Sequence, residues 1–137
     1  MFRNLLPIEM KLAFFIGLGG FAGSMARYGL HMLVHKWWPL SFPYGTLLIN
    51  IIGCLLIGLI LGIAQRETWM SEILKVTLAT GFCGGFTTFS AFAYENIKLL
   101  QSGQLVSSLF YITCSVVLGV LATLAGLSLV EKFTHTS

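Results

Sequence analysis

The chain has 137 residues, of which 56% are hydrophobic and 9% are charged. Soluble domains carry about 25% charged residues, so this composition excludes an ordinary soluble domain and indicates an integral membrane protein. The formal net charge is +3, but the basic residues are scattered among apolar segments, and nucleic-acid binding is therefore not expected.

Four apolar stretches are long enough to cross a bilayer as helices, because a span needs about 20 mostly apolar residues. We predict spans at about 12–30, 44–64, 73–100 and 105–130. The first stretch follows a basic start without a small-residue cleavage site, so we expect a retained helix rather than a signal peptide. The connections are too short to hold a soluble domain. The prediction is an all-α membrane protein with one four-helix domain, residues 1–137.

Glycines recur at close spacing in the first two predicted spans, where they would let helices approach closely in lipid. They are Gly17, Gly20 and Gly23 in the first span and Gly53, Gly58 and Gly62 in the second.

Four spans place both termini on one side of the membrane, which allows the basic residues to be counted by side. The terminal side has Arg3, Lys11, Arg66, Lys75 and Lys132, and the other side has Arg27, Lys36 and Lys98. Five against three is a weak bias, so the positive-inside rule gives no firm orientation. Insertion of copies in both orientations and a chance result in a small protein both remain open.

The third span contains "TGFCGGFTTFSAF", residues 80–92, which we expect to interrupt the helix. Gly84 and Gly85 are predicted to supply the unusual dihedrals of the break. Lipid cannot satisfy the N–H and C=O groups exposed by a break at membrane depth. Carbonyls freed between Gly84 and Thr87 could coordinate a cation, as unwound helices do in transporters. The alternative is a packed kink whose neighbours satisfy these groups.

Phe89 and Phe92 follow the predicted break and, three residues apart, share a helical face. The positive edges of such rings can attract an anion without trapping it as a fixed countercharge would. Core packing is the alternative for an isolated pair. The hydroxyls of Thr87, Thr88 and Ser90 add hydrogen-bond donors that an anion can use.

Polar side chains within the predicted spans are candidates for the same path. Glu95 lies on the face of Phe92, either near the water interface or on a polar path. Asn50 has apolar neighbours and shares a face with Thr46, so its amide either bonds another helix or lines the path.

Arg27, near the end of the first span, either extends to the headgroups or sets the field of an anion vestibule. Tyr111 and Ser115, four apart in the last span, present hydroxyls on one face, for which interhelical bonding is the alternative.

Histidines and cysteines do not form a convincing metal or catalytic set. His31 and His35 share a helical face, but no Asp, Glu or Cys lies at a spacing that would complete a metal site. No serine or cysteine has an evident activating base, so the chain is not expected to be an enzyme.

Three segments, "GGFAGSMARYG", "GTLLINIIGCLLIG" and "GFCGGFTTFSAF", occur in that order within four short spans. Together they resemble the small bacterial fluoride channels known as Fluc or CrcB, over essentially the whole chain. The resemblance implies an antiparallel dual-topology homodimer in the bacterial inner membrane, with a third helix broken at its centre. Each dimer would hold two pores that export cytoplasmic fluoride by passive electrodiffusion and protect the cell from fluoride toxicity.

The resemblance also assigns roles to residues of this chain. The pore residues it implies are Asn50, Phe89, Phe92, Ser90, Glu95 and, less securely, Tyr111 and Ser115. It implies that Arg27 lies in the vestibule, and that backbone carbonyls of Gly84 and Thr87 bind a structural sodium ion at the dimer interface. The family commonly has "TTFSTF", whereas this chain has Ala91 in place of the second threonine of the pattern, which leaves Ser90 as the hydroxyl between the rings.

Two other classes of protein share some of these features. A small multidrug-resistance transporter has the same length, four spans and dual-topology dimers, but it needs a glutamate in its first span, and residues 12–30 contain no acid. A non-transporting membrane scaffold would explain the glycines but leaves Asn50 and the broken helix without a use.

Overall fold

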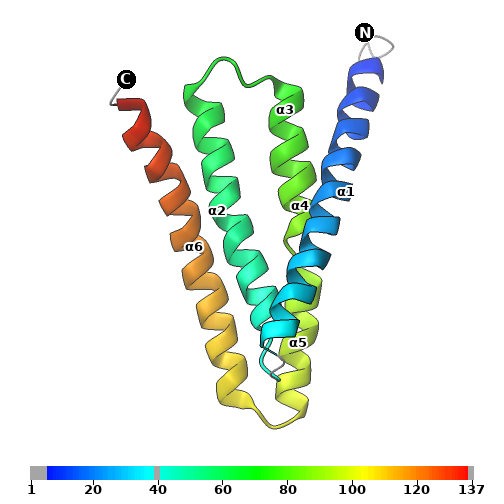
Figure 1. The fold of residues 1–137 in the computed structure, drawn as a ribbon, viewed down its shortest axis with the longest axis vertical. Coiled ribbons are helices and arrows are strands. Elements are labelled where there is room, and N and C mark those ends of the chain that lie inside the picture. The colour runs from blue at the N-terminus through cyan, green and yellow to red at the C-terminus, as the bar shows by residue number, and fades with distance from the viewer. Residues whose placement is uncertain (1–5, 39–40, 136–137) are drawn as a thin grey trace.

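The computed structural model describes residues 6–38 and 41–135, and within them every regular element is helical. Four helical segments are long and apolar enough to cross a membrane, which confirms the predicted fold class. The elements are α1 (Leu6–Trp37), α2 (Tyr44–Arg66), α3 (Glu72–Val76), η2 (Thr77–Cys83), α4 (Gly84–Phe86), α5 (Phe89–Gln101) and α6 (Leu105–His135). Figure 1 shows that α1 begins and α6 ends at the same end of the molecule, as an even number of spans requires. Arg3, counted above, and residues 39–40 of the first connection lie outside the described residues.

The outer helices are longer than the apolar stretches predicted from sequence. α1 has 32 residues and α6 has 31. At 1.5 Å per residue each is about 45–48 Å long, against a hydrocarbon thickness of about 30 Å. Their polar ends stay helical because helix geometry does not depend on the apolar surroundings that define a span.

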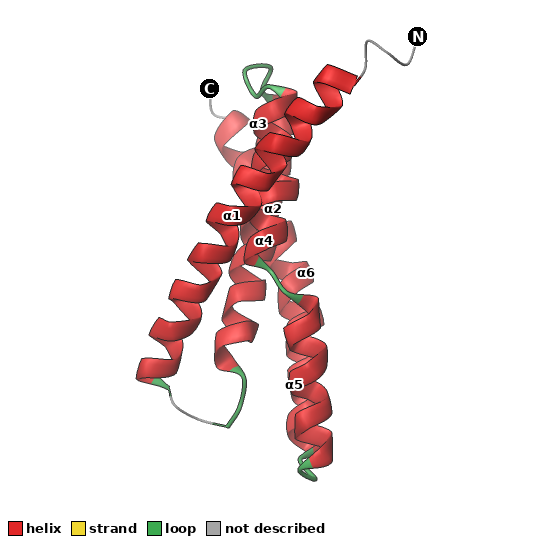
Figure 2. Cartoon of the chain, turned by 90° about the vertical axis from the view of Figure 1, so that its right-hand side faces the viewer, coloured by secondary structure: helices red, strands yellow, loops and turns green. Residues whose placement is uncertain are grey.

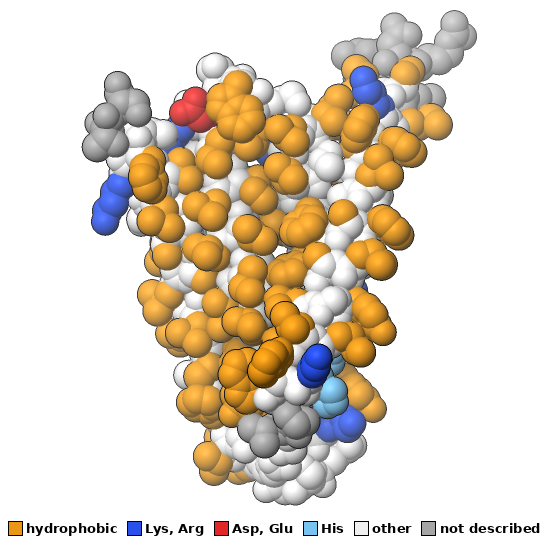
Figure 3. Space-filling model, viewed as in Figure 1, with side chains coloured by type: hydrophobic (Ala, Val, Ile, Leu, Met, Phe, Trp, Pro, Cys, Tyr) orange, Lys and Arg blue, Asp and Glu red, His pale blue; other side chains and the backbone are white. Residues whose placement is uncertain are grey.

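The surface has the character expected of a chain surrounded by lipid. In Figure 3 hydrophobic side chains cover the middle of the visible face, and charged side chains are concentrated towards its two ends. Large apolar residues such as Phe14, Phe21 and Leu121 are more than half exposed, which in water would be costly over so wide an area.

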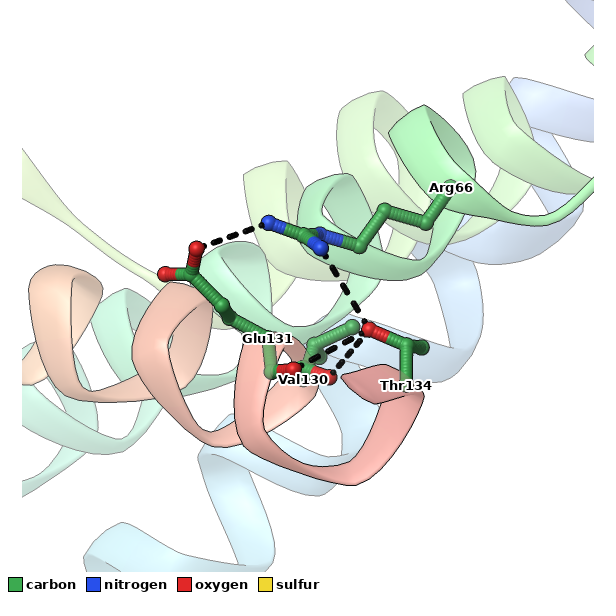
Figure 4. Close-up of polar contacts among 4 residues, drawn as sticks. All are labelled: Arg66, Val130, Glu131 and Thr134. Atoms are coloured by element: carbon green, nitrogen blue, oxygen red, sulfur yellow. Dashed lines mark hydrogen bonds and ion pairs between the residues drawn. The ribbon is translucent and has the colours of Figure 1, made fainter. Parts of the chain in front are cut away.

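α2 and α6 form the most extensive helix pair. Their backbones approach closely at Gly58 and Gly126, where a side chain would collide with the facing main chain. At the end of the pair, Arg66 Nη2 lies 3.2 Å from Glu131 Oε1, and Arg66 Nη1 donates to Thr134 Oγ1 at 3.4 Å (Figure 4). This ion pair is exposed, so its contribution to stability is small.

α1 crosses the first half of the third span through glycines on both sides. Gly19 and Gly23 of α1 face backbone atoms of residues 77–86, and Gly81 and Gly85 face the backbone of α1. Each pair has a spacing of four, so both helices present a small-xxx-small face. Gly17 makes no such approach within the described chain, because a Cβ there would meet nothing within 4 Å.

The third span is broken at Thr87 and Thr88, which are extended with φ/ψ of −79°/159° and −149°/117°. The prediction that Gly84 and Gly85 supply unusual dihedrals is wrong. Gly84 has helical dihedrals of −64° and −38°, and the one glycine with positive φ in the described chain is Gly103. Gly85 is instead required for close approach, because a Cβ there would collide with the carbonyl of Gly20.

The π-helical turn η2, which is separated from the break by the short helix α4, was not predicted from the sequence. It places the carbonyl of Thr77 against Gly19 of α1. Wide turns of this kind occur mostly as single insertions in α-helices, often at functional sites.

The break changes the neighbours of the third span. η2 and α4 pack on α1, whereas α5 packs on α6 and makes few contacts with α2. Figure 2 shows α1 and α5 diverging below the break. The interruption therefore redirects one span from one partner helix to another.

A groove beside the helix break as candidate functional site

Asn50 of α2 holds the broken backbone by two hydrogen bonds to one residue. Its Nδ2 donates to the carbonyl of Thr88 at 3.1 Å, and the N–H of Thr88 donates to Asn50 Oδ1 at 2.8 Å. The amide thus replaces, for Thr88, the partners that a continuous helix would supply. This satisfies the requirement that non-helical backbone at membrane depth be bonded by protein.

At the break, two carbonyls lose the N–H donors that a continuous helix would give them. In a continuous helix the N–H of Thr88 would donate to the carbonyl of Gly84, but here it donates to Asn50. The N–H of Ala91 would donate to the carbonyl of Thr87, but it donates to Thr88 Oγ1 at 3.3 Å, as an N-cap bond of α5. Gly84 and Thr87 are the two residues whose carbonyls the family resemblance implied as ligands of a sodium ion.

Phe89 and Phe92 lie together on α5, as their spacing predicts, with ring centroids 5.7 Å apart. Phe89 is 79% exposed, whereas Phe92 is half-buried and meets Tyr111 of α6 edge-on, with centroids 5.0 Å apart. An apolar ring at the start of a helix, exposed beside a break, is not explained by packing within this chain.

Glu95 is the centre of a hydroxyl network that links three helices. Its Oε1 accepts from Thr46 Oγ1 of α2 at 2.7 Å, and its Oε2 accepts from Tyr111 of α6 at 2.8 Å. Thr46 and Tyr111 are buried. The carboxylate is thereby fixed next to Phe92, on the face that the sequence predicted.

A groove of about 460 Å³ runs along the break. Asn50, Phe89, Phe92 and Ser115 are among its lining residues, together with Gly84, Thr87 and Thr88 of the break itself. Ser115 Oγ is buried and has no hydrogen-bond partner among the described residues. A buried hydroxyl without a partner is unfavourable unless something that visits the groove takes its bond.

Four predicted residues do not line this groove: Glu95 and Tyr111, which form the network described above, and Ser90 and Arg27. Ser90 is exposed, and its Oγ lies 3.4 Å from Thr88 Oγ1 rather than in the groove lining. Arg27 is half-buried on α1, a helix that contributes no residue to the groove. Within one chain, therefore, neither Ser90 nor Arg27 lies where it would contact an ion in the groove.

Sequence reasoning missed the buried pair formed by Ser108 and Asn96. Ser108 Oγ donates to Asn96 Oδ1 at 2.9 Å, and Asn96 Nδ2 donates back to the carbonyl of Phe92 at 2.9 Å. The pair attaches α6 to the helix that carries the phenylalanines. The sequence feature that could have predicted this pair is the polar residue Asn96, directly after Glu95 in an apolar span.

Comparison with known proteins decides the family. A family model described as CrcB-like protein, camphor resistance, matches residues 14–127. The chain belongs to the CrcB-like family.

Relatives of this CrcB-like chain match along nearly their whole length. A protein of Flavobacterium psychrophilum is 48% identical over 123 residues, which cover 90% of this chain and 99% of the relative. A protein of Azobacteroides pseudotrichonymphae is 37% identical, with coverage of 90% and 99%, and one of Chlorobium phaeobacteroides is 40% identical, with 92% and 98%. Each of these relatives is named a fluoride-specific ion channel.

These relatives and the four apolar helices identify the CrcB-like chain as a multi-pass protein of a bacterial membrane. The relatives are named as channels and not as enzymes, in agreement with the prediction from sequence.

Proposed function

We propose that this chain forms a fluoride-selective channel that exports cytoplasmic fluoride by passive electrodiffusion. The ion specificity follows from the names of relatives that align over almost all of both chains. The observation that carries the proposal is the groove, which combines an unpartnered buried hydroxyl on Ser115 with the exposed ring of Phe89.

The groove offers what a small, strongly hydrated anion requires when it leaves water. Hydroxyl donors replace its lost hydration, and ring edges of Phe89 and Phe92 supply weak positive charge. Because neither group carries a full charge, the anion is not trapped, which conduction requires. Ser115 supplies a donor, and Asn50 positions the break that presents both rings.

Two copies in antiparallel arrangement would complete the path. In one chain the groove is a surface feature, and Phe89 and Gly84 are exposed beside it. An ion cannot cross lipid along an open groove, so a second wall is needed. A second copy would supply that wall, and each copy would bring its own groove, giving two pores.

A sodium ion between the two copies fits the break. The carbonyls of Gly84 and Thr87 lack their usual helical donors, as described above, and carbonyl oxygens of unwound backbone are the ligands by which membrane proteins coordinate Na⁺. When bound, the ion would supply positive charge that joins the two broken helices.

Fluoride efflux from liposomes tests the proposal. Purified protein is reconstituted in sodium-containing vesicles loaded with fluoride or with chloride, and a potassium ionophore holds the voltage. We expect rapid fluoride loss, negligible chloride loss, and loss of fluoride flux in Phe92→Ile, which keeps an apolar side chain but removes the ring edge.

The matched control is Phe133→Ile, an exposed phenylalanine near the end of α6 and far along the chain from the groove. Its flux should equal that of the wild type. Trapped fluoride in vesicles that contain well-folded wild-type protein would overturn the channel proposal.

A further inference from the structure

A second cavity, of about 440 Å³, lies where α1, α2 and α5 diverge. It is lined by the last turns of α1 and α5 and the start of α2, and therefore lies at the end of the molecule where the α1–α2 connection runs. In Figure 3, Lys, Arg and His side chains meet at this lower end.

The cavity and the groove have no lining residue in common, but side-chain contacts join them. Glu95 lines the cavity, and it accepts a hydrogen bond from Tyr111, whose ring contacts Phe92 of the groove. The cavity therefore lies next to the side chains that border the groove.

Four charged or titratable side chains besides Tyr44 line the cavity, and they come from two helices. His31 and His35 lie on α1, and Glu95 and Lys98 lie on α5. The ring of His31 rests on the first turn of α2, where a Cβ built on Gly45 would lie 3.0 Å from His31 Cδ2. Tyr44 is the titratable residue that α2 contributes.

The charge of this cavity depends on its histidines. Besides its histidines, the cavity has one basic side chain, Lys98, and one acidic side chain, Glu95. Protonation of His31 and His35 adds up to two positive charges at the entrance. Arg27 and Lys36 also lie on α1, but neither lines the cavity.

We propose that His31 and His35 make this cavity an anion-collecting entrance whose attraction for fluoride rises as the imidazoles take up protons; the inference rests on the proposed function. Histidine is the side chain that changes charge between about pH 8 and pH 5. A cleft lined by one sign of charge raises the local concentration of the opposite ion, and salt screens the effect.

Efflux at two pH values tests the inference. Vesicles at fluoride concentrations below saturation are compared at about pH 7.5 and about pH 6, with protein-free vesicles at each pH to subtract leakage of neutral HF. We expect wild-type efflux to be roughly two- to fivefold faster at the lower pH in low salt. The ratio should fall to about one in concentrated potassium gluconate, because the screening length is then only about 3 Å.

Variants of His31 and His35 test whether these two side chains cause the pH dependence of efflux. His31→Gln with His35→Gln should have the same efflux at both pH values, and His31→Lys with His35→Lys should have fast efflux at both. Lys36→Gln is the matched control, because it removes a nearby charge that does not line the cavity, and it should keep the wild-type ratio.

The outcomes separate the inference from the proposed function. Fluoride efflux that is independent of pH in the wild type, or a pH ratio that survives in the glutamine variant, overturns the inference and leaves the channel intact. Absence of fluoride efflux at either pH overturns the proposed function itself. If the glutamine variant does not fold, the inference is tested by the lysine variant and the salt series. A lysine variant whose efflux still depends on pH, or a wild-type pH ratio that persists in concentrated salt, overturns it.

Discussion

At the scale of single residues, two polar side chains of the groove have opposite relations to the rest of the chain. Asn50 uses its amide oxygen and one N–H on the backbone of Thr88, whereas Ser115 Oγ has no partner in the described chain. The first side chain therefore supports structure directly. The second carries a desolvation cost that folding does not recover, which is typical of a group reserved for a ligand.

This difference predicts the effect of removing hydroxyls on α6. Ser115→Ala should leave the free energy of unfolding unchanged or raise it by up to about 1 kcal/mol, because no bond is lost and the desolvation cost of the hydroxyl is removed. It should slow fluoride efflux roughly tenfold, because a hydrogen bond to a charged group is lost on the path. Thermal unfolding in detergent and liposome efflux measure the two effects.

Ser108→Ala is the control for that prediction. Its hydroxyl is buried and donates to Asn96, so its removal should cost about 1–3 kcal/mol of stability. If Ser115→Ala destabilises the fold as much as Ser108→Ala and leaves efflux unchanged, Ser115 is a packing residue.

At the scale of helices, close approach is decided by which face of each helix meets its neighbour. Gly19 and Gly23 face the third span, while Gly17, on the same glycine-rich helix, faces open space. In lipid the packing of such faces is the main force that associates helices, since apolar side chains gain little by leaving lipid for protein.

The two sides of α1 should therefore respond differently to a methyl group. Gly23→Ala should lower the free energy of unfolding by about 1–3 kcal/mol, because its Cβ would collide with the backbone of Phe82, which cannot rotate away. Gly17→Ala should be neutral or slightly stabilising, by up to about 1 kcal/mol, because alanine favours the helix. Equal unfolding temperatures for the two variants in detergent would contradict this arrangement of α1.

At the scale of the whole molecule, the proposal of a second copy rests on the open groove and the diverted carbonyls. A protein with a surface groove in lipid gains a sealed path only by association. The carbonyls of Gly84 and Thr87 gain ligation only if a cation or a partner reaches them.

If sodium joins the two copies as proposed, its removal should weaken the proposed dimer. Light scattering in detergent should give twice the mass of one chain in sodium buffer, and exchange of sodium for N-methylglucamine should lower both this mass and the unfolding temperature. Potassium at equal ionic strength controls for general salt effects. A monomer in sodium buffer, or a dimer indifferent to the exchange, would exclude sodium as the link.

The sequence by itself determined the features that depend on local composition and spacing. Apolar length predicted all four spans, and the three-residue spacing of Phe89 and Phe92 placed both rings on one face. The region of the break was also readable, because hydroxyls and glycines interrupt an apolar run there.

Tertiary structure alone decided which residues fulfil each role. The break lies at Thr87 and Thr88 because Asn50, 38 residues earlier in the chain, offers both a donor and an acceptor to that backbone. Gly85 is needed for contact with α1 rather than for its dihedrals, and the cavity with His31 and Glu95 arises where α1 and α5 diverge. Such pairings depend on the rotation and crossing of packed helices, which spacing within one helix does not specify.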